Sequence, residues 1–155
     1  MWFHKTVVTV FGLGYAPVAP GTFGALGAVF LLGLSKWFDF VISTPLLLTL
    51  IIICGLVGIW STDKLTAEWG DDPSKVVIDE FVGYLIGILF LPVTWVNILL
   101  CFVLFRFFDI LKPLGVRTID KKVKGGLGVM LDDVLAGVYT CISLHLINFF
   151  LSQGI

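Results

Sequence analysis

The stretch TPLLLTLIIICGLVGIW at residues 44–60 contains no charged side chain and is almost wholly apolar. Such a run approaches the roughly 20 residues that an α-helix needs to cross the hydrocarbon core of a bilayer. Similar runs recur along the chain, and 58% of its 155 residues are hydrophobic while only 14% are charged. A soluble helical domain of this length does not need so much apolar surface. The runs therefore predict an integral membrane protein.

Apolar periodicity and helix breakers divide the chain into five helical segments. They run approximately over Thr22–Phe38, Thr44–Trp69, Val76–Phe90, Trp95–Leu111 and Leu131–Leu151. Residues 1–21 are too rich in glycine and proline for a further conventional span, so we expect them to form an interfacial or re-entrant segment. No internal repeat is visible. Residues 1–155 are therefore predicted to form a single all-α domain, a polytopic membrane bundle of about five helices.

Charged residues are distributed unevenly over this predicted topology. Five crossings place the N-terminus, residues 61–77 and residues 112–130 on one side, which holds every lysine except Lys36. Basic residues concentrate on the cytoplasmic side of membrane proteins, so we expect this side to be cytoplasmic. All acidic residues except Asp39 lie on or near the same side, which the orientation rule does not require. Charges of both signs at one face therefore indicate a functional site there.

Composition also argues against several other classes of protein. The formal net charge of -1 leaves no basic excess that would neutralise the phosphates of a nucleic acid. The cysteines Cys54, Cys101 and Cys141 lie in apolar runs without CxxC spacing, so we expect them to be packing residues. The only histidines, His4 and His145, are predicted on opposite sides of the membrane. This separation excludes a lipid phosphatase that needs a catalytic histidine beside a second His–Asp pair.

Two motifs place adjacent acidic residues near the starts of predicted helices. In IDEFVG, Asp79 and Glu80 lie in the first turn, where the helix macrodipole favours carboxylates. A capping role explains one of them better than it explains both on so apolar a helix. In GGLGVMLDDVLAG, Asp132 and Asp133 lie at the mouth of another apolar run. Adjacent side chains point about 100° apart on a helix, so these two aspartates are expected to differ in role.

The motif FRFFDILKP combines both signs of charge on one helix. Arg106, Asp109 and Lys112 are spaced i, i+3, i+6, so all three can share one face. An ion-pair ladder at the end of the span would explain this spacing. However, Arg106 lies inside the apolar run, where ionisable residues usually face the interior of the protein and mark a functional path.

Two further segments are candidate phosphate contacts. The lysines of KKVKGGLG, including Lys124, precede a Gly-rich turn at a helix start, and such turns present backbone N–H groups to anions. The same lysines also fit an orientation signal or a contact with anionic lipid. In APVAPGT, Thr22 is either the N-cap of the following helix or part of an anion site. The residues leave both choices open.

Together, the motifs supply the ligands and cations of phosphoryl-transfer chemistry. Oxygen ligands without cysteine or histidine suit Mg²⁺ rather than zinc. Carboxylates that hold Mg²⁺, with arginine and lysine on the phosphate oxygens, are the parts that this chemistry needs. The acidic candidates are Asp79, Glu80, Asp109, Asp132 and Asp133, and the basic candidates are Arg106, Lys112 and Lys124.

Four motifs in this order, APGTFGALGA, IDEFVG, FRFFDILKPLGVRTID and KGGLGVMLDDVLAG, resemble the phosphatidylglycerophosphatase A family of bacterial inner membranes. The resemblance covers the chain from about Gly12 to Tyr139. It implies a Mg²⁺-dependent phosphatase that converts phosphatidylglycerophosphate to phosphatidylglycerol and inorganic phosphate. The protein would be a multi-pass protein of the bacterial cytoplasmic membrane, with its active site on the cytoplasmic side.

The resemblance also implies which residues form the active site. It maps onto Asp79, Glu80, Arg106, Asp109, Lys112, Asp132 and Asp133. We predict Glu80, Asp109, Asp132 and Asp133 as metal ligands, with Asp79 as a ligand or as an orienting residue. Arg106, Lys112, Lys124 and Thr22 are the predicted phosphate contacts. Attack by a metal-bound water and formation of an aspartyl-phosphate are both compatible with this set of residues.

Two other membrane classes are less compatible with the sequence. The DG and AR pairs of the CDP-alcohol phosphotransferase motif are absent from the chain. The alternative of a non-enzymatic divalent-cation-binding protein or an ion-coupled transporter is less favoured, because transporters place ionisable residues near the bilayer midplane in repeated folds. Here the carboxylates gather at one end and no repeat is visible.

Overall fold

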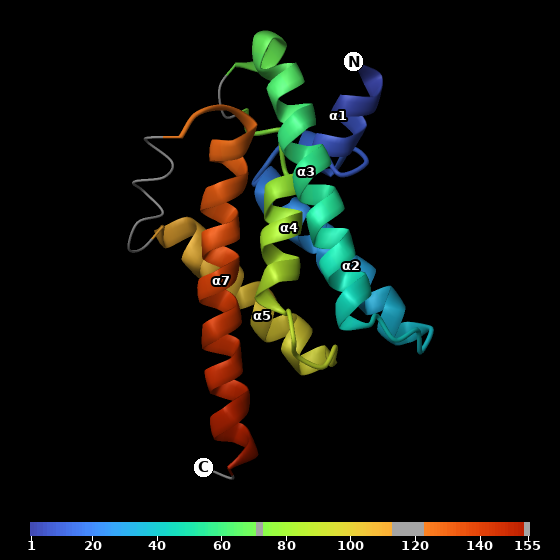
Figure 1. Ribbon diagram of the computed structural model, residues 1–155, viewed down its shortest axis with the longest axis vertical. Coiled ribbons are helices and arrows are strands. Elements are labelled where there is room, and N and C mark those ends of the chain that lie inside the picture. Colours follow the sequence, from blue (N-terminus) through green and yellow to red (C-terminus); the bar gives the residue numbers. More distant parts are fainter. Residues whose placement is uncertain (71–72, 113–122, 154–155) are drawn as a thin grey trace.

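The structure, a computed structural model, describes residues 1–70, 73–112 and 123–153, which form helices and no β-strand. The helices are α1 (Trp2–Val8), the 3-10 helix η1 (Leu13–Tyr15), α2 (Pro20–Trp37), α3 (Thr44–Trp69), α4 (Ile78–Gly87), α5 (Trp95–Leu111) and α7 (Gly125–Ser152) (Figure 1). The prediction of an all-α chain is therefore confirmed over these residues.

Five of these helices correspond to the predicted segments. The bounds of α3 and α5 agree with the prediction, and α2 begins at Pro20, slightly before Thr22. Proline at the first position of a helix has its φ already set for the helix and lacks an N–H that would otherwise be unpaired. The N-terminal residues contain the short helices α1 and η1 and no helix long enough to span a membrane.

Helix α4 is shorter than the predicted Val76–Phe90 segment at both ends, because it ends at Gly87 and a tertiary contact defines its start. Val77 is the N-cap residue, with a non-helical φ of -141°. Its backbone N–H donates to the carbonyl of Val8 at 2.8 Å, which ties the start of α4 to the end of α1. The helix therefore begins at Ile78 and not at Val76.

Helix α7 begins earlier than predicted, at Gly125 rather than at Leu131. The Gly-rich residues that resemble a turn are helical because Asp63 of α3 satisfies one of their backbone donors. The Gly126 N–H donates to Asp63 Oδ1 at 2.6 Å. A helix start needs such partners for its unpaired N–H groups, and here the partner comes from a residue distant in sequence.

The short helix α4 lies at the centre of the fold and packs against α2, α3, α5 and α7 (Figure 1). Most of its residues are buried, namely Ile78, Asp79, Phe81, Val82, Gly83, Tyr84, Leu85 and Gly87. The α4–α7 contact is a backbone approach, since a Cβ atom placed on Gly137 would overlap the carbonyl oxygen of Gly83. This approach sets the distance between the polar residues that α4 and α7 carry.

Helices α3 and α7 are long and apolar enough to cross a membrane by length and composition. Only 17% and 22% of their most apolar 18-residue windows are buried inside the protein, whereas a core helix of a soluble protein would be mostly buried. Helix α5, with 17 residues, and α4, with 10, are shorter than the roughly 20 residues of a conventional span. The structure thus contains two candidate spans, and five crossings stay a prediction.

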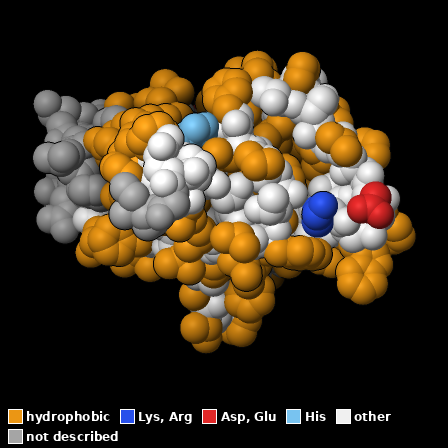
Figure 2. Space-filling model, turned by 90° about the horizontal axis from the view of Figure 1, so that it is seen from below, with side chains coloured by type: hydrophobic (Ala, Val, Ile, Leu, Met, Phe, Trp, Pro, Cys, Tyr) orange, Lys and Arg blue, Asp and Glu red, His pale blue; other side chains and the backbone are white. Residues whose placement is uncertain are grey.

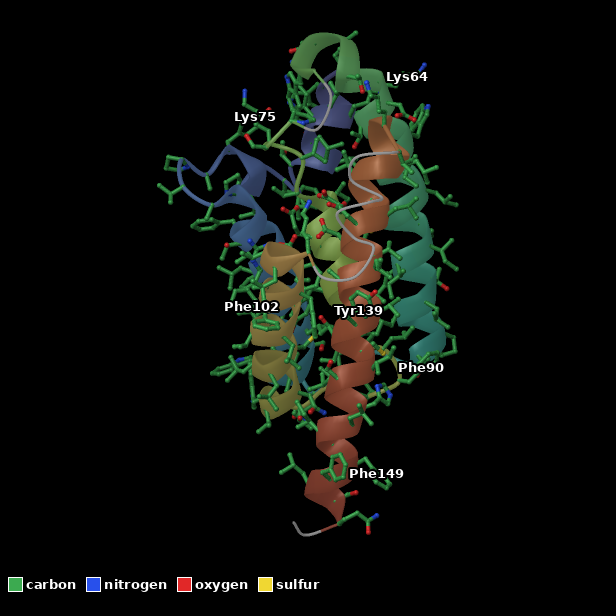
Figure 3. All side chains as sticks on the ribbon, turned by 90° about the vertical axis from the view of Figure 1, so that its left-hand side faces the viewer. Lys64, Lys75, Phe90, Phe102, Tyr139 and Phe149 are labelled. Atoms are coloured by element: carbon green, nitrogen blue, oxygen red, sulfur yellow. The ribbon has the colours of Figure 1, made fainter. Side chains whose placement is uncertain are left out.

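The two ends of the molecule differ in polarity. Lys64 and Lys75 lie toward one end, and Phe149 lies toward the other (Figure 3). Seen from the latter end, the surface is mostly hydrophobic, with few charged side chains (Figure 2). This distribution matches the predicted concentration of charge at one face. The sequence-motif residues Arg117 and Asp120, and the lysines Lys121 and Lys122, lie outside the described residues.

The close contact of α4 with α7 predicts that Gly137→Ala destabilises the protein. The added methyl group would force the two backbones apart, and such overpacking typically costs about 1–3 kcal/mol. Unfolding in a titration of denaturing detergent should therefore begin at a lower detergent fraction. The control is Gly55→Ala in α3, where a Cβ atom would meet nothing within 4 Å. A Gly137→Ala protein as stable as the Gly55→Ala protein would contradict the close contact.

Candidate active site

The site begins at the first turn of α4, which carries Asp79 and Glu80. The Val77 hydrogen bond to Val8 fixes the direction of this turn, and the helix N-terminus favours negative charge there. Asp79 is only 6% exposed. A carboxylate so deeply buried needs a strong compensating interaction.

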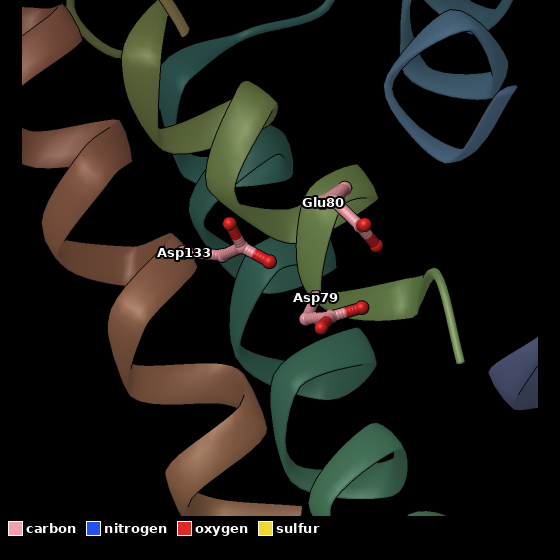
Figure 4. A group of neighbouring side chains, drawn as sticks. All are labelled: Asp79, Glu80 and Asp133. Atoms are coloured by element: carbon pink, nitrogen blue, oxygen red, sulfur yellow. The ribbon is translucent and has the colours of Figure 1, made fainter. Parts of the chain in front are cut away.

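Asp133 of α7 joins these two residues. Asp79, Glu80 and Asp133 each offer a carboxylate oxygen, and these atoms lie within 4.8 Å of one another (Figure 4). Asp133 is 4% exposed. Its position depends on the α4–α7 contact, because a Cβ atom on Gly83 would lie 2.6 Å from the Asp133 carbonyl oxygen. We call Asp79, Glu80 and Asp133 the carboxylate cluster.

One oxygen of each member of the carboxylate cluster is buried and has no hydrogen-bond partner. These atoms are Asp79 Oδ1, Glu80 Oε2 and Asp133 Oδ1. Unpaired polar atoms are rare in protein interiors and usually indicate a ligand, an ion or a strained site. Three unpaired carboxylate oxygens so close together would repel one another strongly if ionised. A divalent cation would both pair the oxygens and offset the charge, and hard oxygen donors fit Mg²⁺.

Asp109 and Arg106 of α5 lie beside the carboxylate cluster. They form an ion pair with each other, and both side chains are mostly buried. Asp109 lies within electrostatic range of Glu80 and Asp133, and Arg106 lies within range of Glu80. Arg106 and Asp109, spaced i, i+3, therefore form the expected ion pair. That pair lies next to the other acidic residues, so it is more than an ion-pair ladder at the end of a span.

Asp132 and Lys112 form a second ion pair at the edge of the site. Lys112 Nζ lies 2.6 Å from Asp132 Oδ2. Asp132 and Asp133 are neighbours on α7, yet one pairs with a cation and the other belongs to the carboxylate cluster. This difference follows from the angle of about 100° between successive side chains on a helix.

The N-terminus of α2 forms another wall of the site. A Cβ atom on Gly21 would overlap Glu80 Oε1 and would lie 3.4 Å from Arg106 Nη1. The N-cap of α2 is Ala19, so Thr22 is not the cap that one interpretation assigned to it. Thr22 lies in the first turn, next to Gly21, and is partly exposed. Sequence reasoning missed Gly21, although the small residues of APGTFGALG allow such a close approach.

Lys124 and the Gly-rich start of α7 lie away from the carboxylate cluster. Lys124 is exposed and is the N-cap residue of α7. On a helix that rises about 1.5 Å per residue, it lies roughly 12–14 Å along the axis from Asp132 and Asp133. The Gly126 N–H, a candidate phosphate donor, is already bonded to Asp63. No sequence signal pointed to Asp63, because its partner is 63 residues away.

Of the nine predicted site residues, the structure thus brings seven together, from the start of α4, the last turns of α5 and the third turn of α7. They are Asp79, Glu80, Arg106, Asp109, Lys112, Asp132 and Asp133. Thr22 lies on the adjoining turn of α2, and Lys124 lies apart. The four predicted metal ligands divide into two members of the carboxylate cluster, Glu80 and Asp133, and two ion-paired residues, Asp109 and Asp132. The roles of all these residues stay predictions.

Comparison with known proteins identifies the family to which this chain belongs. The family model described as phosphatidylglycerophosphatase A matches residues 6–148. A Haemophilus influenzae protein named phosphatidylglycerophosphatase A is 42% identical over 147 residues, covering 91% of this chain and 86% of that protein. Its Escherichia coli namesake is 33% identical over 148 residues, covering 94% and 83%.

A third relative carries a different name. A Bacteroides thetaiotaomicron protein provisionally named phosphatidylinositol-3-phosphatase is 46% identical over 140 residues, covering 86% of each chain. No solved structure matches this chain. The family match spans all the residues that form the site. The chain therefore belongs to the phosphatidylglycerophosphatase A family, and it is a phosphatase that acts on a phosphate monoester.

Proposed function

We propose that this protein is a Mg²⁺-dependent lipid phosphatase that hydrolyses phosphatidylglycerophosphate to phosphatidylglycerol and inorganic phosphate. The observation that carries the proposal is the carboxylate cluster, with three buried and unpartnered oxygens. Two cations, Arg106 and Lys112, lie beside the acidic residues. Family membership favours this enzyme over a cation-binding or ion-transport protein without catalytic activity.

Asp79, Glu80 and Asp133 are the residues that would hold the metal, with Asp109 as an additional carboxylate within electrostatic range of Glu80 and Asp133. When bound, Mg²⁺ supplies a Lewis acid for phosphoryl oxygens and lowers the pKa of a bound water. This assignment differs from the sequence-based prediction in two residues. Asp79 becomes a direct metal ligand, and Asp132 becomes a residue on the substrate side of the site. Its physical basis is that Asp132 pairs with Lys112, whereas Asp79 Oδ1 has no partner.

Arg106 and Lys112 would bind the terminal phosphate. Without substrate, each cation contacts an aspartate, Asp109 or Asp132 respectively. A phosphate that enters the site offers oxygens to the same donors and would replace those carboxylates. Arginine forms bidentate contacts with phosphate, and both cations stabilise charge on its oxygens. Exchange with phosphate would leave Asp109 available beside Glu80 and Asp133.

A carboxylate near the phosphate has two chemical options. It can accept a proton from an attacking water, or it can attack phosphorus and form an aspartyl-phosphate. Both routes break the bond between phosphorus and the lipid oxygen and release the lipid alcohol. The first yields inorganic phosphate directly, and the second yields it after water hydrolyses the aspartyl-phosphate. Incubation with labelled substrate followed by acid quenching separates them, because only the second route leaves labelled phosphate on the protein.

A membrane location would give the site access to its substrate. Two candidate spans flank it, α3 and α7, and their apolar surfaces are largely exposed. We propose a multi-pass protein of the bacterial cytoplasmic membrane with the site on the cytoplasmic side, because lysines concentrate at that end. The acyl chains could then stay in the bilayer while the head group reaches the charged residues.

Phosphate release from phosphatidylglycerophosphate is the direct test. Purified protein should release phosphate with Mg²⁺ and should lose this activity in EDTA, with recovery after Mg²⁺ is restored. Phosphatidylinositol-3-phosphate belongs in the same assay, because a relative carries the name of a phosphatase for that lipid. A folded protein that hydrolyses only the inositol lipid would overturn the proposed substrate, and one that hydrolyses neither lipid would overturn the proposed activity.

The two classes of carboxylate predict different responses to substitution. Asp79→Asn should raise the Mg²⁺ concentration for half-maximal activity by at least about 10-fold, since it removes a proposed metal contact. Asp132→Asn should mainly raise the KM for the lipid, because it removes the partner that orients Lys112. Asp39→Asn, at the other end of the molecule, is the control. Equal shifts in the Mg²⁺ requirement for Asp79→Asn and Asp132→Asn would contradict the division.

Gly21→Ala tests the close contact between the first turn of α2 and the Glu80 carboxylate. The added methyl group would displace the Glu80 carboxylate, so kcat/KM should fall by roughly 10-fold or more, in line with the effect of small misplacements at active sites. Gly55→Ala again provides the matched glycine control. Unfolding should be measured alongside, so that lost activity with unchanged stability can be assigned to Glu80. Full activity in Gly21→Ala would exclude the close contact.

A further inference from the structure

An unusual turn connects α1 to η1. Val10, Phe11 and Gly12 are consecutive and all have positive φ, at 46°, 56° and 100°. Such conformations are unfavourable for residues with a side chain and persist only where the surrounding structure imposes them. Val10 is 8% exposed, whereas Phe11 is 90% exposed. The turn therefore buries a small apolar side chain and directs a large aromatic one outward.

Thr9 holds this turn in place from the interior. It is fully buried, and its hydroxyl donates to the Lys5 carbonyl at 2.7 Å and accepts from the Gly12 N–H at 3.0 Å. The Thr9 carbonyl accepts from the Gly14 N–H at 2.9 Å. The outward direction of Phe11 is thus determined by a hydrogen-bond network and is not a consequence of a loose loop.

Further exposed apolar residues follow Phe11, and one of them, Tyr15, lies next to a lysine. Tyr15 is 53% exposed and Val18 is 74% exposed. Lys75 Nζ lies 5.9 Å from the ring centre of Tyr15 and 5.5 Å from that of Trp69. Aromatic rings with adjacent lysines are typical of the level at which a membrane protein meets lipid head groups. Lysines at this level also attract anionic lipids.

The same segment is attached to the active site at both ends. Before it, the Val8 carbonyl accepts from Val77 N–H, two residues before Asp79. After it, the first turn of α2 meets the site at Gly21, against the Glu80 carboxylate. Any surface that fixes the depth of residues 10–19 in a bilayer therefore also fixes the depth of the carboxylate cluster.

We propose that residues 10–19 form an interfacial anchor that binds the head-group region of an anionic phospholipid leaflet. Phe11 and Val18 insert between lipids, while Tyr15 and Lys75 contact head groups. The inference rests on the proposed function, because it places the active site at the depth of the phosphate of a lipid substrate. It goes further by assigning this task to a rigid turn outside the candidate spans.

A nitroxide spin label measures the depth directly and does not depend on activity. Phe11→Cys is labelled in a Cys54→Ala, Cys141→Ala background, which leaves only the buried Cys101. The reference positions are Lys64→Cys near the charged end of α3 and Ile53→Cys on its lipid-exposed middle. In vesicles of anionic phospholipid, the ratio of oxygen to nickel-complex accessibility at position 11 should lie between the two references. A ratio equal to either reference overturns the anchor.

Kinetics provide a second test that separates anchoring from catalysis. Phe11→Ser should raise the KM for phosphatidylglycerophosphate in anionic vesicles about fivefold or more, with kcat unchanged. The KM for a short-chain, water-soluble form of the lipid should not change. The control is Val41→Ser, which alters a residue that is 84% exposed at the opposite end. An equal KM increase for both substrates, or no increase for either, would contradict the proposal. A wild-type protein without activity would instead contradict the proposed function and leave the depth measurement valid.

Discussion

The backbone contact between α4 and α7 is the interaction on which the arrangement of the site depends. At Gly83 and Gly137 the two helices approach more closely than any side chain would allow. This approach brings Asp133 to Asp79 and Glu80, and it allows a 10-residue helix to serve as the centre of the fold. A larger separation would move Asp133 away from Asp79 and Glu80, and the carboxylate cluster would not form.

The acidic residues of the site fall into two groups, those paired with a cation and those without such a partner. Asp109 and Asp132 are neutralised by Arg106 and Lys112, whereas the carboxylate cluster has no protein cation among the described residues that pairs with it. Burial of unpaired carboxylates is unfavourable, which is the physical basis for proposing the cluster as a cation site. The paired aspartates instead hold the two cations, Arg106 and Lys112, that we propose as phosphate contacts. A metal site and a phosphate site can therefore coexist within a small volume.

The proposed interfacial anchor, residues 10–19, is connected to the carboxylate cluster. Val8 and Gly21 connect the N-terminal residues to the first turn of α4 from two directions. The Val8 contact joins two backbone segments, whereas the Gly21 backbone lies against the Glu80 side chain. For the lipid substrate proposed above, such a connection would hold the active site at the depth of the reacting phosphate.

The sequence by itself determined that the chain is helical, where α3 and α5 begin and end, and which acidic and basic residues are candidates for the chemistry. Long apolar runs and breakers are local signals, and charges clustered in so apolar a chain are costly unless they form a site. The tertiary structure alone decided that Asp79 joins Glu80 and Asp133 while Asp132 pairs with Lys112, because the direction of a side chain depends on helix rotation and packing. The tertiary structure also places Asp63 where it accepts a hydrogen bond from the first turn of α7, and it places Gly21 against Glu80. Those contacts join residues far apart in the sequence, and no local pattern encodes them.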